Sequence, residues 1–241
     1  MPLQSSVRAS KKPLRLDDEV RFLRSWIEKP LHVGAVMPSG RLLARTMAQY
    51  VDIHAAGPVV ELGPGTGAIT SALIEHGIEQ RRLVLVEYNP GFCALLRDRY
   101  PQARVVQGDA YTLRDTLWNV LSVPATAIVS GLPLVTKPMP MRLRLVRDAF
   151  AALAPGAPFV QFTYSVVPPI PKSLPGVSAE ASERIWMNLP PARVWVYRKR
   201  QTHAVCWVPL KLTNGRAQDP RHSRLAAIRF AQRETCSCRG L

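Results

Sequence analysis

The feature that most constrains this chain is an apolar segment that runs directly into a glycine-rich turn, residues 59–67 (VVELGPGTG). Glycine stands at every second position of the turn, at Gly63, Gly65 and Gly67. Because glycine has no Cβ atom, the backbone of such a turn can approach a ligand closely. The residues that follow have helical composition, and the first N–H groups of a helix lack partners within it. The sequence therefore predicts a strand, a tight turn and a helix whose N-terminus faces a ligand.

Three acidic residues lie at the ends of apolar segments, where they suit an adenosine-containing cofactor. Glu87 ends the second segment 20 residues after the turn, the spacing at which a carboxylate binds the two ribose hydroxyls. Glu61 precedes the first glycine by two positions and could hold an ammonium group. Asp109 ends the segment 103–110 and could bind the amino group of adenine. Singly, Glu61 could be a surface acid and Asp109 a helix N-cap, but the features in this order favour cofactor binding.

Two cofactors compete for this pattern. The spacing Gly63-x-Gly65-x-x-Ala68 also satisfies the dinucleotide motif with alanine in third place. Glu61 favours S-adenosylmethionine because a nicotinamide dinucleotide has no ammonium for it to hold, and the additional glycine of the turn supports that preference. The whole set resembles the cofactor site of class I methyltransferases. The predicted residues for S-adenosylmethionine, and for its product S-adenosylhomocysteine, are Ser39, Glu61, Gly63, Pro64, Gly65, Thr66, Gly67, Glu87, Tyr88, Asn89, Asp109, Ala110 and Ser130.

Strand-like and helix-like segments alternate through the middle of the chain, which predicts a parallel sheet with helices on both faces. We expect an α/β fold of the class I, Rossmann-like methyltransferase type, with a mostly parallel seven-stranded sheet and an additional N-terminal amphipathic helix. Ligands in such sheets bind beyond the carboxyl ends of the strands. The expected strands are 58–62, 82–87, 103–107, 125–130 and 157–164, and the expected helices are 40–51, 67–77, 91–100, 112–119 and 139–154.

The segment after the fifth strand is harder to assign. Residues 166–175 are rich in proline and are expected to form a long loop over the site. Residues 184–188 and 192–198 alternate like strands, and residues 203–209 could form a further one. Which two of these three segments form the closing hairpin is left open.

The chain has 241 residues, a net charge of +15 and a pI near 10.4, which predicts an anionic partner, either nucleic acid or a membrane surface. No run of 18 uncharged apolar residues and no signal-peptide core is present, so we expect a cytoplasmic protein. The four cysteines match no usual zinc pattern, and no metal is expected. We divide the chain into a disordered basic N-terminus (1–16), N-terminal helices (17–51), a cofactor-binding domain (52–210) and a basic tail (211–241).

Residues 17–29 form a predicted amphipathic helix with basic flanks. Val20, Leu23 and Ile27 lie on one stripe, widened by Phe22 and Trp26. This profile is typical of a helix that lies in a membrane interface, and equally of a lid helix that packs on its own domain.

The corner after the fourth strand, residues 130–134 (SGLPL), separates two substrate classes. Adenine N6-methyltransferases place an Asn or Asp here, then a Pro, then an aromatic ring that stacks on the base. This chain has Ser130 as the polar residue and Leu134 in place of the aromatic ring. Stacking is a large part of base recognition, so its absence counts against a nucleobase substrate.

From residue 22 to about 200, the chain resembles the soluble bacterial phospholipid N-methyltransferases. The resemblance rests on residues 30–39 (PLHVGAVMPS), the glycine turn, residues 129–133 (VSGLP), residues 159–164 (FVQFTY) and residues 188–195 (NLPPARVW). Residues from about 201 onward depart from the pattern, which leaves the role of the tail open. A ribosomal RNA adenine dimethyltransferase, which shares the Glu-Leu-Gly-Pro-Gly sequence, is the alternative.

The resemblance implies successive methylation of phosphatidylethanolamine toward phosphatidylcholine by a protein bound peripherally to the cytoplasmic membrane. It also implies that helix 17–29 contacts the membrane, that the partners are anionic lipid and the substrate lipid, and that nucleic acid is not a partner. No obligate protein partner is inferred. We assign Tyr164 to orient the amine and Ser130 to the catalytic corner. Aromatic candidates for the methylated ammonium are Trp186, Trp195 and Tyr197, and cationic candidates for the lipid phosphate are Lys137 and Arg142.

Overall fold

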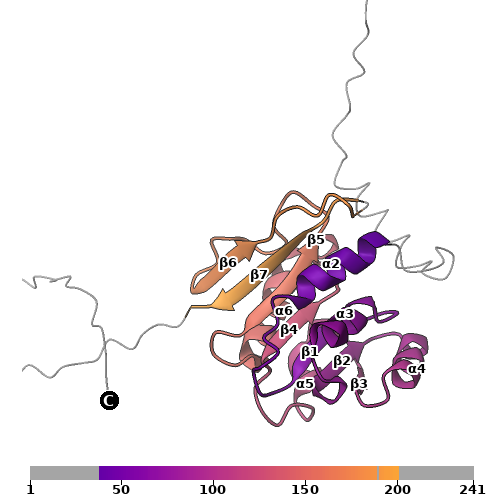
Figure 1. Ribbon diagram of the computed structural model, residues 1–241. Helices are drawn as coiled ribbons and strands as arrows, with labels where there is room; N and C mark the ends of the chain where they lie inside the picture. Colours follow the sequence, from indigo (N-terminus) through magenta and orange to yellow (C-terminus); the bar gives the residue numbers. More distant parts are fainter. Residues whose placement is uncertain (1–37, 189, 201–241) are drawn as a thin grey trace, which may run out of the picture. The chain divides into compact units, whose positions relative to one another are not determined.

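The computed structural model describes residues 38–188 and 190–200. Within them a seven-stranded sheet has the order β3-β2-β1-β4-β5-β7-β6, with β1 to β5 parallel and β7 antiparallel to both of its neighbours (Figure 1). This confirms the predicted mostly parallel sheet. The strands are β1 (Val59–Leu62), β2 (Leu83–Glu87), β3 (Arg104–Gln107), β4 (Ala127–Ser130), β5 (Pro158–Thr163), β6 (Val177–Ala181) and β7 (Arg193–Lys199).

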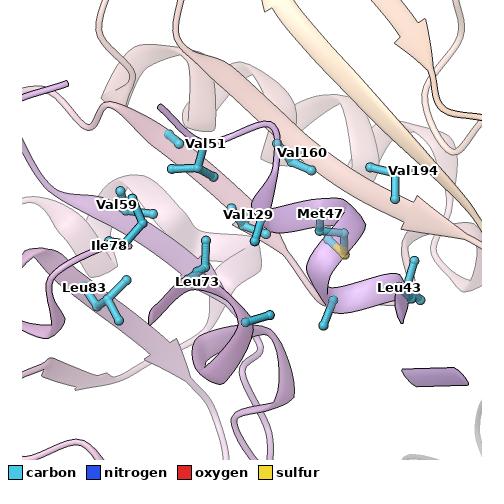
Figure 2. Packing of buried hydrophobic residues seen from close by; sticks show 14 of the residues in the cluster. Leu43, Met47, Val51, Val59, Leu73, Ile78, Leu83, Val129, Val160 and Val194 are labelled. Carbon is cyan, nitrogen blue, oxygen red and sulfur yellow. The ribbon is translucent and has the colours of Figure 1, made fainter. Parts of the chain in front are cut away.

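Helices cover both faces of the sheet because successive residues of each buried strand point to opposite sides. On one face, Val59 and Val129 pack with Met47 of α2 and Leu73 of α3, as Figure 2 shows. On the other face, the alternate strand residues pack against α5 and α6. The helices are α2 (Pro38–Ala48), α3 (Ala68–His76), α4 (Pro90–Arg99), α5 (Leu113–Leu117) and α6 (Met139–Ala152), with short 3-10 helices η1 (Gln80–Arg82), η2 (Ala110–Thr112) and η3 (Leu134–Thr136).

The closing hairpin corrects one prediction. Its first strand is β6, which lies before the segment 184–188 that looked like a strand. That segment forms turns, closed by a bridge between Ile185 and Ala192. The sequence Val-Ser-Ala-Glu-Ala of β6 carries a weak strand signal because an edge strand packs on one side only and its outer residues are polar.

Other differences are small. The expected helix 112–119 divides into η2 and the five-residue α5, and the remaining boundaries move by a few residues at most. The proline-rich segment is irregular, as predicted. The predicted basic N-terminus, the helix at 17–29, the strand at 203–209 and the basic tail lie outside the described residues. Within residues 38–188 and 190–200, no helix has the length and apolarity needed to cross a bilayer.

Candidate functional site

The glycine turn adopts a conformation that only glycine takes readily. Gly63, Gly65 and Gly67 have φ angles of 68°, 55° and 85°, in the left-handed region. A Cβ atom at Gly63 would lie 2.7 Å from the Leu132 side chain, and one at Gly67 would lie 2.8 Å from the ring of Tyr100. A Cβ atom at Gly65 would meet nothing within 4 Å. The outer two glycines are therefore needed for packing, whereas Gly65 borders open space that a cofactor can occupy.

Glu87 ties the end of β2 to this turn. One carboxylate oxygen accepts the backbone N–H of Gly65 at 3.0 Å, and the other accepts the N–H of Asn89 at 2.8 Å. Each oxygen has two lone-pair directions, so one direction on each remains for a ribose hydroxyl. The predicted ribose acceptor and the open glycine are thus directly connected.

Glu61 is fully buried under the turn, at the end of β1. One carboxylate oxygen, Oε2, accepts the hydroxyl of Thr70 in α3 at 2.7 Å. Among the described residues no hydrogen-bond partner reaches Oε1. Burial raises the pKa of Glu61 to about 8, although the Thr70 hydrogen bond opposes the shift. A buried carboxyl group with one unpaired oxygen fits an ammonium group in its chemistry.

The other predicted cofactor residues lie around the same edge of the sheet. Asn89 caps α4 by accepting the N–H groups of Gly91 and Phe92, and Tyr88 beside it is 76% exposed. Asp109 caps η2 by accepting the N–H of Tyr111 at 2.8 Å, so the helix-cap alternative describes part of its role. The remaining members lie in the turn, in η2 and in α2: Pro64, Thr66, Ala110 and Ser39, the last described as backbone only.

The corner after β4 packs against the glycine turn. A Cβ atom at Gly131 would lie 2.8 Å from the carbonyl oxygen of Gly63, so this position has no room for a side chain. Ser130 is fully buried, and its hydroxyl accepts the N–H of Leu132 at 3.4 Å. A substrate could touch Ser130 only if the corner opened. Leu134 is 1% exposed and belongs to the core, so it presents no surface to a base.

Gln161 on β5 is the residue of this corner that the sequence reasoning missed. It is fully buried and pairs in register with Ser130. Its amide nitrogen donates to the carbonyl oxygens of Leu132 and Phe162, both at 2.8 Å. A polar residue in an otherwise apolar strand was the available signal, because a buried amide requires partners.

Tyr164 follows β5 at the same edge of the sheet. Its ring meets Phe162 edge-on, with centroids 5.3 Å apart, and it packs partly buried against the core. Burial raises the pKa of its hydroxyl, which therefore stays protonated at neutral pH. In this state Tyr164 can orient an amine through a hydrogen bond but does not act as a phenolate base.

Two of the three aromatic candidates are core residues. Trp195 and Tyr197 are 2% and 0% exposed, whereas Trp186 is 75% exposed. Trp195 and Tyr197 lie on β7 with their side chains packed in the core, so these two residues cannot surround a headgroup. Strand alternation alone could not distinguish a core aromatic residue from one that lines a site.

The two cationic candidates have different surroundings. The Arg142 guanidinium donates to the carbonyl oxygens of Val135, Lys137 and Pro169. It therefore holds the β4 corner and the proline-rich loop together and is not available as a phosphate ligand. The ammonium of Lys137 lies 5.1 Å from the ring centre of Tyr111.

The fold and the site can now be compared with known proteins. The ornithine lipid N-methyltransferase of Singulisphaera acidiphila is 32% identical over 151 residues, which cover 61% of this chain and 79% of that enzyme. The chain belongs to this family of S-adenosylmethionine-dependent methyltransferases. A Bacillus cereus O-methyltransferase in complex with S-adenosylhomocysteine has the same fold, with a TM-score of 0.50, 16% identity and coverage of 80% of this chain and 94% of that one.

A second relationship concerns the cofactor half. The family described as ribosomal RNA adenine dimethylase matches residues 41–120. The ribosomal RNA small subunit methyltransferase A of Chlorobium chlorochromatii is 34% identical, but the match covers only 38% of this chain and 34% of that enzyme. The family match includes the glycine turn, Glu87 and Asp109 and ends before the β4 corner. The family match therefore covers the cofactor site and does not include the corner.

Proposed function

We propose that this methyltransferase modifies the primary amine of a membrane lipid headgroup, with phosphatidylethanolamine as the expected substrate. The observation that carries the proposal is the β4 corner. Leu134 is buried in the core where a base-stacking ring would be needed, and Ser130, the polar residue of the corner, is fully buried and hydrogen-bonded to Leu132. A corner of this kind lacks the two devices by which a nucleobase is recognised.

The extent of the relationships supports the same conclusion. The match to the lipid enzyme covers 79% of that relative, whereas the ribosomal family match stops at residue 120, before the corner. Because that relative acts on ornithine lipid, whose headgroup also carries a primary amine, this lipid is the second candidate substrate. The net charge of +15 supports a peripheral position on an anionic membrane, at about 1 kcal/mol for each basic residue near the surface.

The residues divide the chemical task between them. Bound S-adenosylmethionine supplies an electrophilic methyl group. Glu61 would hold its ammonium and Glu87 its ribose, while Gly65 would let the backbone approach it closely. The burial of the two carboxyl groups excludes water from that side. A headgroup amine with a pKa near 10.4 is neutral in only about one molecule in a thousand at pH 7, so the lone pair costs roughly 4–5 kcal/mol. Partial desolvation at the corner lowers that cost, and the protonated hydroxyl of Tyr164 orients the amine.

The test is an assay with labelled S-adenosylmethionine and three substrates in parallel: phosphatidylethanolamine vesicles, ornithine lipid vesicles and small-subunit ribosomal RNA. Each lipid preparation includes an anionic lipid, and Glu61→Gln serves as the control for cofactor-dependent transfer. Label in either lipid supports the proposal and identifies the headgroup, and chromatography of the products counts the methyl groups. Label in RNA alone would contradict the proposal and select the adenine dimethyltransferase, which the family match to residues 41–120 keeps as the second candidate.

A further inference from the structure

Four of the most exposed apolar side chains belong to two loops that emerge at one edge of the sheet. Val166 and Val167 are 76% and 56% exposed, and Trp186 and Met187 are 75% and 81% exposed. We refer to these four residues as the apolar rim. Isolated exposed apolar residues are common, whereas exposed apolar residues that gather on one surface mark an interaction site.

The strand register places the rim beside the site. Thr163, the last residue of β5, pairs with Arg193, the first residue of β7. The loop that leaves β5 and the loop that enters β7 therefore emerge together, at the upper end of both strands in Figure 1. Since β1, β4 and β5 are parallel, this is also the edge at which Glu61 and Ser130 lie.

Both loops are anchored at their bases. In the first, Ile170 is fully buried and exchanges hydrogen bonds with the Tyr197 hydroxyl through its N–H and its carbonyl oxygen. In the second, the N–H of Ile185 donates to Ala192 at 2.8 Å, and the buried Asn188 donates to Pro190 at 2.7 Å. Each loop therefore exposes two apolar side chains from a base that the core holds in place.

The charge next to the rim suits a bilayer. The guanidinium of Arg184 lies 5.6 Å from the ring centre of Trp186, so a cation accompanies the most amphipathic side chain of the rim. Trp is enriched at membrane interfaces, where its ring lies at the level of the headgroups, and Arg beside it attracts anionic lipid. We propose that the apolar rim inserts into the lipid bilayer and presents the β4 corner to the headgroup layer. This inference rests on the proposed lipid substrate and identifies the surface that reaches it.

The test uses the full chain with two sets of substitutions. The rim variant carries Val166→Ser, Val167→Ser and Met187→Ser, and it keeps Trp186 because that residue is the exposed aromatic candidate for the methylated ammonium. The control variant carries Trp118→Ser and Val123→Ser, which replace side chains that are 72% and 52% exposed between α5 and β4, at the opposite edge of the sheet. Sedimentation with vesicles of phosphatidylethanolamine and phosphatidylglycerol measures partitioning, and S-adenosylmethionine binding reports that each variant is folded.

We expect the rim variant to lose about tenfold or more in vesicle partitioning and the control variant to partition like the wild type. Equal loss in both variants, or none in the rim variant, would overturn the inference. So would a rim variant that sediments as a smaller species without vesicles, because the surface would then join two copies of the chain.

A second measurement separates this inference from the proposed function. Methyl transfer is assayed on a short-chain phosphatidylethanolamine dispersed as monomers, which requires no membrane. If the rim docks on bilayers, the rim variant keeps its activity on the dispersed lipid and loses it on vesicles. Wild-type protein that binds vesicles through the rim but methylates neither lipid would refute the proposed substrate class and leave the docking surface standing. Loss of activity on the dispersed lipid in the rim variant would overturn docking as the role of the rim.

Discussion

The two halves of the sheet edge differ in what their polar groups bind. On the β1–β2 side, Glu61 has an unpaired buried oxygen, and Gly65 borders open space. Glu87 accepts a hydrogen bond from the glycine turn, and its carboxylate oxygens can accept further hydrogen bonds. On the β4–β5 side, Gln161 and Arg142 direct their N–H groups to backbone carbonyl oxygens, although Gln161 Oε1 has no partner among the described residues. The first half is preorganised for a polar cofactor, and the second is held rigid internally beside an apolar surface.

This difference shows where specificity resides. A cofactor shared by many enzymes requires the same few polar groups each time, so that half matches both lipid and RNA methyltransferases. The half that contains the β4 corner is distinguished by what it does not expose, since Leu134 and Ser130 are both buried. Experiments that separate cofactor binding from methyl transfer test whether the two halves are as independent as they look.

The largest effect is expected in the pH dependence of stability. The pKa of Glu61 is about 8 in the folded protein and near 4.5 when exposed, so the folded state binds the proton more tightly. The unfolding free energy therefore falls as pH rises from about 4.5 to about 8, by at most roughly 5 kcal/mol from this group. Glu61→Gln mimics the protonated form, so denaturant unfolding without cofactor at pH 5, 6.5 and 8 should show the variant gaining on the wild type. A constant difference across these pH values would contradict the assigned burial.

The next largest effect is expected in cofactor affinity. Glu61→Gln retains an oxygen that can accept the Thr70 hydroxyl but cannot ionise, whereas the wild-type carboxyl can lose its proton when an ammonium binds opposite it. We expect S-adenosylmethionine affinity to fall by about 2 kcal/mol, or roughly 30-fold, in calorimetric titration. Vesicle partitioning should be unchanged. Unaltered cofactor affinity would mean that Glu61 serves only to hold α3.

The open glycine offers a smaller effect with a closely matched control. Gly65→Ala and Gly176→Ala both place a Cβ atom where nothing lies within 4 Å, at φ angles of 55° and 71°. Each should lower the unfolding free energy by about 1–2 kcal/mol. Only Gly65→Ala should also weaken cofactor binding, by about tenfold, because its Cβ atom enters the cofactor space. Similar cofactor affinities in the two variants would remove Gly65 from the site.

The smallest effect is expected from a substitution of Tyr164, on the β4–β5 side of the sheet edge. Tyr164→Phe keeps the ring contact with Phe162 and removes the protonated hydroxyl. We expect kcat to fall by up to about tenfold while S-adenosylmethionine affinity stays the same. Steady-state kinetics on dispersed lipid give both values. Full activity in this variant would assign Tyr164 to packing, and a loss of cofactor affinity would show that the two halves are coupled.

The accuracy of prediction differs along the chain for a physical reason. The segments from β1 to β5 alternate with helices, and short-range periodicity was enough to place them. The strand β6 was missed because it lies at the edge of the sheet and its sequence is therefore less apolar than that of a central strand. Residues 184–188 alternate like a strand, but they form turns. Trp195 and Trp186 look alike in the sequence, but register puts one in the core and the other at a loop tip.

The sequence by itself predicted the cofactor half, because the glycine turn is a local feature of one strand–turn–helix unit and the acids Glu61, Glu87 and Asp109 each lie at or near the end of one of the first three strands. Only the tertiary structure decided the rest: that Gln161 secures the β4 corner, that Arg142 is committed to three backbone carbonyls, and that Leu134 is buried. These outcomes depend on which distant segments meet across the sheet. No pattern of neighbouring residues encodes such contacts, because each side chain is satisfied or left exposed by partners far away in the chain.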